Sequence, residues 1–142
     1  MKLSPQADSI EQRGLSLPEG ELGNWVHRIL TAMYPHGLAQ DRRRDVRYPY
    51  PHLIYITAVG DDDCPMEESL VVTGKHLSEG GLSFYHPEPI SYRRVIASLD
   101  TGNGKFLGIL LDLCWCRFTR QGWYESGGRF IRIVQSPVRS GG

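Results

Sequence analysis

The sequence predicts a mainly β domain, an antiparallel barrel or sandwich, preceded by one amphipathic helix. The chain has 142 residues, about the size of one domain with a single hydrophobic core. Hydrophobic residues make up 40% of it and charged residues 23%, which is the composition of a folded globular protein. From residue 53 onward, short strand-like runs follow one another with no helical period between them, which indicates an antiparallel β architecture.

The predicted helix begins after Pro18 and ends before the breaker sequence Tyr34-Pro35-His36-Gly37. A stripe of this kind normally packs against the body of the domain, and a helix that forms a homodimer is the alternative. Residues 1–38 are therefore predicted to be a polar tail followed by this helix. The apolar residues at helical spacing are Leu22, Trp25, Val26, Ile29, Leu30 and Met33.

The hydrophobic period changes to two at Leu53, where the first strand is expected. A second signal is Asp100-Thr101-Gly102-Asn103-Gly104, a strong hairpin turn between two apolar runs. The hydrophilic segment before Leu53, QDRRRDVRYPYP, is interpreted as a linker or arm, and residues 136–142 as a tail. The expected strands are Leu53–Ala58, Ser69–Lys75, Gly81–His86, Tyr92–Leu99, Lys105–Thr119 and Gly128–Val134.

The charge balance indicates a local binding site rather than a general attraction to polyanions. Sixteen basic residues balance sixteen acidic ones, so the net charge is zero, and no nucleic acid partner is expected. Thirteen of the basic residues are arginine and three are lysine. Arginine offers planar, bidentate donors, which suit phosphate, carboxylate or base edges.

Hydropathy and cysteine content predict the compartment. No apolar stretch is long enough to cross a membrane, and the first residues lack the apolar region of a secretory signal, so we expect a cytoplasmic protein without membrane insertion. Three cysteines, Cys64, Cys114 and Cys116, give no disulfide framework and fit a reducing compartment. They also lack the spacing of a zinc site, and Cys114 and Cys116 are expected to be buried free thiols on a strand instead. No acid, base and nucleophile set for catalysis can be assembled, so neither an enzyme nor a resident metal or cofactor is predicted.

Two short segments carry the functional prediction. Arg42, Arg43, Arg44 and Arg47 concentrate positive charge just before the first strand. The second segment, Gly74 to Gly81, has an imidazole, a hydroxyl and two adjacent glycines between two expected strands. Taken alone, the first segment could be a solvated linker and the second an ordinary turn between strands.

Together the two segments resemble the PilZ family, the bacterial receptor domain for cyclic di-GMP. The family pattern is an Arg-x-x-x-Arg arm, usually after another arginine, followed about thirty residues later by Asp/Asn-x-Ser-x-x-Gly. Arg43 and Arg47 match the arm, and Arg42 is the preceding arginine. Ser78 and Gly81 match the second motif, whereas His76 stands where the family has Asp or Asn. The resemblance covers residues 39–135 and implies a six-stranded antiparallel barrel of the split-barrel type, with the arm at residues 39–49.

The resemblance also implies the ligand and the role of each residue. Arg43 and Arg47 would clamp a phosphate and the Hoogsteen edge of a guanine, and Arg42 would stack on or bracket a second ligand molecule. Ser78 would bond phosphate or guanine, while Gly80 and Gly81 would leave room for the base. His76, when neutral, would accept a hydrogen bond at one ring nitrogen only.

The predicted mechanism is a non-enzymatic switch. The arm is expected to be ordered by cyclic di-GMP and to relay the signal, through the nearby helix, to an unidentified downstream protein. The alternative is a degenerate PilZ-fold interaction module that does not bind nucleotide, because His76 breaks the motif. A barrel that binds single-stranded nucleic acid through Trp25, Trp115 and Trp123 is disfavoured by the neutral net charge.

Overall fold

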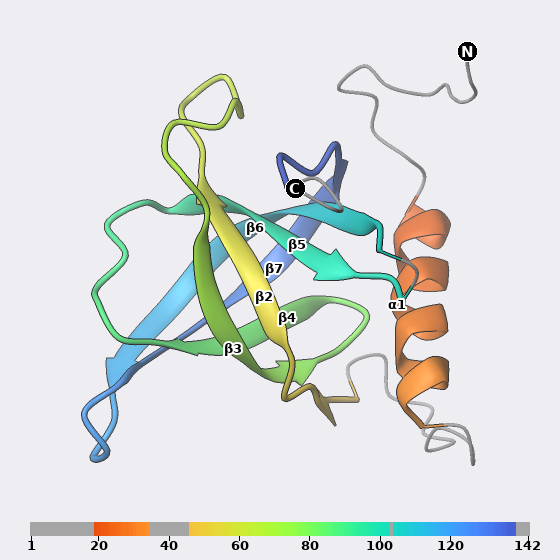
Figure 1. The fold of residues 1–142 in the computed structure, drawn as a ribbon, viewed down its shortest axis with the longest axis horizontal. Helices are drawn as coiled ribbons and strands as arrows, with labels where there is room; N and C mark the ends of the chain where they lie inside the picture. Colours follow the sequence, from red (N-terminus) through yellow and green to blue (C-terminus); the bar gives the residue numbers. More distant parts are fainter. Residues whose placement is uncertain (1–18, 35–45, 103, 139–142) are drawn as a thin grey trace.

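The computed structural model describes residues 19–34, 46–102 and 104–138. These residues form one helix and seven strands (Figure 1). The elements are α1 (Glu19–Met33), β1 (Tyr48–Pro49), β2 (Leu53–Ala58), β3 (Leu70–Leu77), β4 (Gly81–His86), β5 (Arg94–Asp100), β6 (Phe106–Phe118) and β7 (Tyr124–Val134).

The strands form a closed six-stranded antiparallel barrel, as predicted. The strand order is β1-β3-β2-β5-β6-β7-β4, and pairing of β3 with β4 closes the ring. β1 lies outside the ring and pairs only with the end of β3, Tyr48 opposite Leu77 and Pro49 opposite His76. The last residues of the Arg-rich segment are thus a short strand rather than a linker, and Pro49 is tolerated there because the strand is at an edge.

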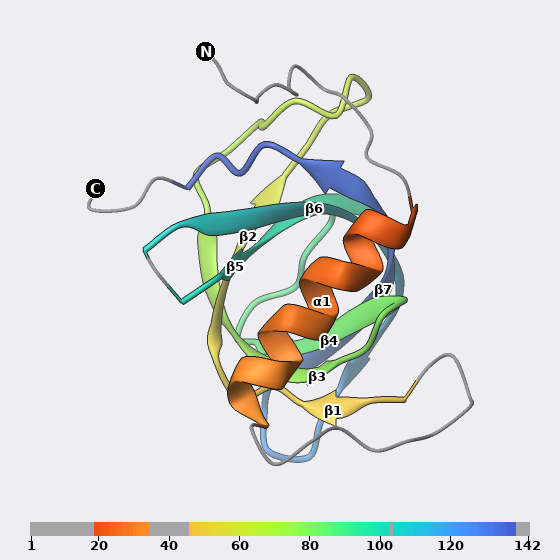
Figure 2. The same cartoon turned by 90° about the vertical axis from the view of Figure 1, so that its right-hand side faces the viewer.

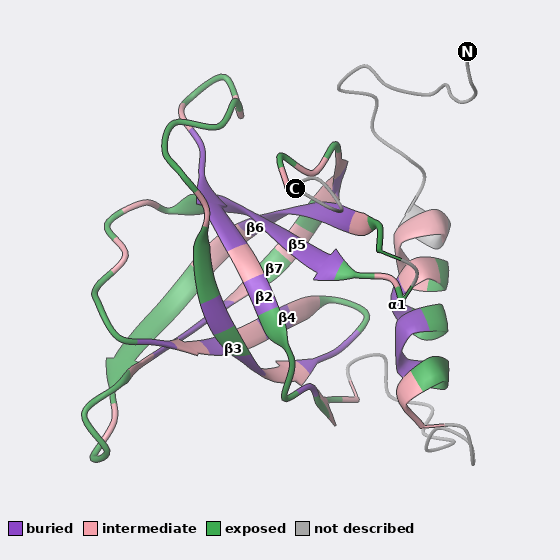
Figure 3. Cartoon of the chain, in the orientation of Figure 1, coloured by how far each residue is buried: buried purple, intermediate pink, exposed green. Residues whose placement is uncertain are grey.

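The alternating apolar residues fill the inside of the barrel. Ile54 and Ile56 from β2, Phe84 from β4 and Ile109 from β6 are almost fully buried. Figure 3 shows these buried segments around the middle of the barrel and exposed residues at its far end and loops. Side chains of alternate residues on each strand meet in one core, which explains why a period of two predicts these elements.

The helix covers one end of the barrel (Figure 2). Val26, Ile29 and Leu30 are buried in the same core as the strand residues, and Leu22, Trp25 and Met33 pack at its margin. This arrangement confirms the amphipathic helix and its packing on the domain. The predicted N-terminal tail lies outside the described residues. In the part of the chain that the structure describes, no helix is long and apolar enough to span a membrane.

Two details of β6 and β7 differ from the prediction. β7 begins at Tyr124 rather than Gly128, because Gly127 and Gly128 continue the strand instead of interrupting it. Cys114 and Cys116 were expected to be buried on their strand, and this was wrong: both are exposed free thiols, as is Cys64 in its turn. Cys114 and Cys116 lie on the part of β6 that continues past the core, where alternation no longer means burial.

Candidate functional site

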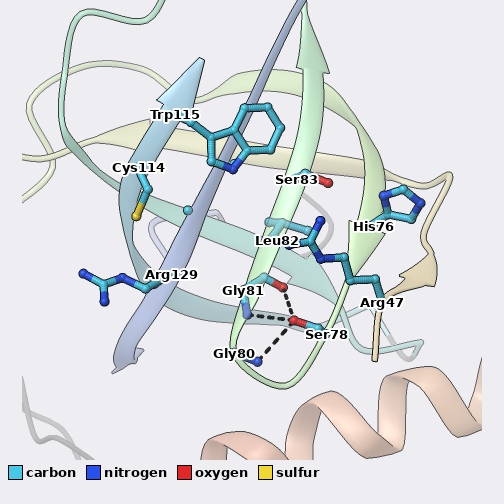
Figure 4. A pocket seen from close by; sticks show the side chains of 12 residues that line it. Arg47, His76, Ser78, Gly80, Gly81, Leu82, Ser83, Cys114, Trp115 and Arg129 are labelled. Carbon is cyan, nitrogen blue, oxygen red and sulfur yellow. Dashed lines mark hydrogen bonds between the residues drawn. The ribbon is translucent and has the colours of Figure 1, made fainter. Parts of the chain in front are cut away.

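The predicted motif residues that the structure describes gather in one groove on the side of the barrel. Its volume is about 210 Å³, and it lies between the β3–β4 turn and the neighbouring part of β6 and β7 (Figure 4). Of the predicted residues, Arg47, His76, Ser78, Gly80 and Gly81 line it, whereas Arg42 and Arg43 lie outside the described residues. The other lining residues are Leu82, Ser83, Cys114, Trp115, Gly127, Gly128 and Arg129.

Ser78 shapes the turn at the floor of the groove. Its side-chain oxygen accepts hydrogen bonds from the amides of Gly80, at 3.3 Å, and Gly81, at 3.1 Å. The amide of Ser78 donates to the carbonyl of Gly81 at 3.0 Å, which closes the turn. Because Ser78 is almost completely buried, its hydroxyl is a structural part of the turn as well as part of the groove wall.

The glycine at position 81 is required by the fold itself. A Cβ at this position would be 2.3 Å from the carbonyl oxygen of Gly128 on β7. Gly81 also lines the groove, so its predicted role beside a ligand base stays a prediction, and the contact with β7 is a second reason for glycine here. Gly80 is exposed at the tip of the turn, so the approach to the groove is open there.

The groove is electropositive. Arg47 and Arg129 line it from opposite sides, and no aspartate or glutamate is among the described lining residues. Burial, then the charges of Lys75 and Arg47, lower the pKa of His76 below its usual value, with Glu125 opposing them. His76 is therefore mostly neutral at pH 7, and burial is the largest cause of its lowered pKa, to which the two cations add.

A buried carboxylate fixes the cations behind the groove. Glu125 on β7 accepts hydrogen bonds from Lys75 Nζ at 2.7 Å and from Arg117 Nη2 at 2.8 Å. Burial alone would raise the pKa of Glu125, but the hydrogen bonds and charges of Lys75 and Arg117 together outweigh burial and lower it. This ion-pair cluster connects β3, β6 and β7, and so holds the strand that carries His76.

Trp115 and Arg129 were not predicted as site residues. Trp115 forms a wall of the groove and is 41% exposed, so one face of its ring is open to a ligand. The sequence held one signal, the adjacent glycines before Arg129 in a strand-like run. Gly127 is opposite Trp115 in the β6–β7 pairing, and a Cβ there would be 2.4 Å from the indole ring. The tryptophan can occupy this place only because residue 127 is glycine.

The arrangement defines a β-barrel with an electropositive, partly aromatic groove, which suits an anionic ligand that contains a planar ring. No protein-family model matches the chain. A search of curated proteins found no match either.

Solved structures of MrkH from K. pneumonia are similar to the chain. The MrkH complex with c-di-GMP aligns over 64% of this chain and 45% of that chain, at 17% identity and a TM-score of 0.44. The apo state of MrkH aligns over 67% and 45%, at 15% identity and a TM-score of 0.44. A third structure, of MrkH described as a c-di-GMP-dependent transcription regulatory factor, gives 17% identity and a TM-score of 0.42. The chain spans less than half the length of these MrkH chains.

Proposed function

We propose that this protein is a non-enzymatic receptor of the PilZ type that binds cyclic di-GMP in the groove. The observation that carries the proposal is the meeting of Arg47 with the His76–Gly81 segment. These two parts of the sequence are far apart in the chain, yet the pairing of β1 with β3 and the β3–β4 turn bring them to one groove. If the Arg-rich segment were only a solvated linker, nothing in the fold would require Arg47 to lie beside the second motif.

The chemistry of the groove supports an anionic purine ligand. Two arginines line the groove and suit phosphate oxygens and the Hoogsteen edge of guanine, although Arg129 also lies 3.9 Å from Asp112. The exposed face of Trp115 offers a surface on which a base can stack. Neutral His76 offers one ring nitrogen as acceptor for a guanine N–H, the role that Asp or Asn has in the family pattern.

The size of the groove limits how much of the ligand it takes. Pockets that enclose a drug-sized ligand have volumes of about 300–1,000 Å³, and this groove has about 210 Å³. We therefore assign one guanine and its adjacent phosphate to the groove. Arg42 and Arg43, which precede Arg47 in the same Arg-rich segment, would hold the remaining phosphate and base.

A contact between the site and the helix supports a relay. The β3–β4 turn carries Glu79, whose Oε1 atom would be 3.4 Å from a Cβ on Gly23 of α1. The turn that lines the groove therefore touches the helix that covers the barrel. Ligand binding that shifts this turn would move the surface of α1 that a downstream protein could recognise.

Calorimetric titration of the full chain with cyclic di-GMP tests the proposal. We expect saturable binding by the wild type, binding at least about tenfold weaker in Arg47→Ala, and unchanged binding in Arg120→Ala. Arg120 is the matched control because it is an exposed arginine that does not line the groove. GTP should not compete. Absence of binding at about 100 μM, where an interaction of about −5.5 kcal/mol half-saturates, would contradict the receptor function.

One observation favours the second candidate, an interaction module that does not bind nucleotide. Ser78 and Gly81 both have roles in the fold, the hydroxyl in the turn and the glycine against Gly128. They would therefore remain in a protein that had lost the ligand. The same titration separates the two candidates, because only the receptor releases or absorbs heat with cyclic di-GMP.

A further inference from the structure

The residue that follows α1, Tyr34, connects the end of the helix to β1. Its hydroxyl donates a hydrogen bond to the carbonyl of Pro49 at 2.6 Å. Its ring lies against the ring of Tyr48, with centroids 5.8 Å apart and planes at 45°. The amide of Tyr34 donates to the carbonyl of Leu30 at 2.8 Å, so the residue is itself held by the helix. We call this set of interactions, made by Tyr34 with Tyr48 and Pro49, the Tyr34 contact.

The register of β1 directs the carbonyl of Pro49 toward the helix end. Pro49 is opposite His76 in β3. The next residue, Tyr50, donates its amide to the carbonyl of Lys75 at 2.8 Å, so these two residues form a bonded pair. Bonded and non-bonded pairs alternate along antiparallel strands, so the carbonyl of Pro49 points away from β3. The hydroxyl of Tyr34 therefore uses an acceptor that the sheet leaves open.

β1 adjoins two residues of the groove. Arg47 directly precedes this strand and is exposed, and Figure 4 shows its side chain extending from this segment into the groove. His76, opposite Pro49, also lines the groove. β1 has only two residues and pairs with the end of β3 alone among the described strands, so few backbone hydrogen bonds fix its position. The Tyr34 contact supports β1 from the side that β3 does not cover.

The Tyr34 contact should affect ligand binding more than folding. Its hydrogen bond is exposed, and water can replace such a bond at little cost to the folded state. Ligand binding has a further requirement, because Arg47 must be fixed where the ligand needs it. A side chain already held in its bound position loses less freedom when the ligand arrives, and the ligand then binds more tightly.

We propose that Tyr34 is a positioning residue of the groove, which ties β1 to the end of α1 and thereby holds Arg47 over the groove. This inference rests on the proposed function. It adds to the contact of Glu79 with α1, because at Tyr34 a hydrogen bond joins the helix end to the strand. Coupling between two sites is reciprocal, so a ligand bound by Arg47 also steadies the end of α1. A partner that recognises this end of the helix would respond to the occupancy of the groove.

Calorimetric titration with cyclic di-GMP tests the positioning role. Tyr34→Phe keeps the ring and removes only the hydroxyl, so we expect the dissociation constant to rise by about threefold to tenfold. Tyr92→Phe is the matched control and should bind like the wild type. The hydroxyl of Tyr92 also donates an exposed hydrogen bond, to Glu67 Oε2 at 3.1 Å, but Tyr92 does not line the groove. In an Arg47→Ala background, Tyr34→Phe should change the affinity by less than about twofold.

Hydrogen exchange of the ligand-free protein tests whether Tyr34 holds β1. The amide of Tyr50, bonded to Lys75 just after this strand, should exchange at least about threefold faster in Tyr34→Phe than in the wild type. Tyr92→Phe should leave this rate unchanged. The amides of β5, a strand paired on both sides, should exchange alike in all three proteins, which shows that the barrel stays intact.

The outcomes separate this inference from the receptor function. A wild type that binds cyclic di-GMP no better than Tyr34→Phe would overturn the positioning role alone, and so would an unchanged exchange rate of the Tyr50 amide in that variant. A full effect of Tyr34→Phe in the Arg47→Ala background would also overturn it, because Tyr34 would then act by another route. A wild type that shows no binding would overturn the receptor function and, with it, the inference that rests on it.

Discussion

The indole ring of Trp115 lies against the backbone of Gly127 on the adjacent strand, with no room between them for a methyl group. A Cβ at position 127 would be 2.4 Å from two carbon atoms of the ring. We expect Gly127→Ala to push the indole out of its place and to lower the free energy of unfolding by about 1–3 kcal/mol, the usual cost of overpacking. Urea denaturation measures the loss, and a change in tryptophan fluorescence would report the displaced ring.

Gly23→Ala is the matched control for this prediction, because it adds the same methyl group where there is space. Its nearest neighbour outside the helix would be Glu79 Oε1, at 3.4 Å, an ordinary contact. Alanine is favoured over glycine inside a helix by up to about 1 kcal/mol, so the variant should be as stable as the wild type or more so. Equal destabilisation by the two changes would show that the Trp115 contact has no special cost.

Glu125 should contribute more to stability than any exposed carboxylate of the chain. Its side chain is 4% exposed and accepts hydrogen bonds from both Lys75 and Arg117. Glu125→Gln keeps the size but removes the charge that both cations face, so we expect a loss of about 1–3 kcal/mol. Glu68→Gln, in an exposed loop, should change stability by less than about 0.5 kcal/mol. Chemical denaturation at pH 7 compares the two variants.

The contribution of Glu125 should also depend on pH in one direction. The pKa of Glu125 is lower in the folded protein than its usual value of 4.5, because the two cations outweigh burial. Its stabilising effect is thus complete above pH 4.5 and is lost as the pH falls through the folded pKa. The stability difference between the wild type and Glu125→Gln should therefore narrow in acid. A difference that stays constant from pH 7 to pH 3 would contradict this role.

Much of the barrel was predictable because its elements have regular periods. β4 has the predicted bounds, Gly81 to His86, since alternating residues lie between clear turn signals. β7 was predicted to begin late because glycines in a strand resemble a break. In this strand the two glycines allow close packing: the ring of Trp115 lies against Gly127, and the backbone of β6 lies against Gly128. Local sequence does not reveal what approaches a glycine from another strand.

The predictable part of the site belongs to two short motifs, Arg47 in the Arg-rich segment and the residues from His76 to Gly81. His76 is in β3, Gly81 is in β4 and Ser78 and Gly80 lie in the turn between them, so one short motif describes all four. Trp115 and Arg129 reach the groove through the pairing of β6, β7 and β4. The register of this pairing cannot be read from a local sequence pattern. The burial of the β6 cysteines was wrongly predicted for a similar reason: the alternation of apolar residues does not show where β6 extends beyond the core.

Ser78 should stabilise the folded protein even in the absence of a ligand, because its hydroxyl holds the β3–β4 turn. Ser78→Ala removes the acceptor for the amides of Gly80 and Gly81 in an almost completely buried position. We expect a loss of about 1–3 kcal/mol in the free energy of unfolding. Ser83→Ala is the control, because it takes a hydroxyl from the same groove without touching the turn. A Ser78→Ala variant as stable as Ser83→Ala would remove the turn role and leave ligand contact as the reason for this serine.

His76 gives the proposed cyclic di-GMP binding a predictable pH dependence. Its pKa is lowered from 6.5 by burial and then by Lys75 and Arg47, so more than half of the rings are neutral at pH 6.5 and a larger fraction is neutral at higher pH. A neutral ring can accept a hydrogen bond from guanine, whereas a protonated ring only donates. We therefore expect nearly constant affinity from pH 8 to pH 7 and a loss of roughly threefold to tenfold once the pH falls below the folded pKa.

Replacing the ring isolates this effect from other titrating groups. His76→Asn provides an acceptor that does not titrate, so its affinity should stay level through the acid range and exceed that of the wild type below the His76 pKa. His27→Asn, at an exposed position of α1, should keep the wild-type profile. Calorimetric titrations at a series of pH values compare the three proteins. An acid loss that persists in His76→Asn would assign the dependence to another group, because the asparagine has no proton to gain.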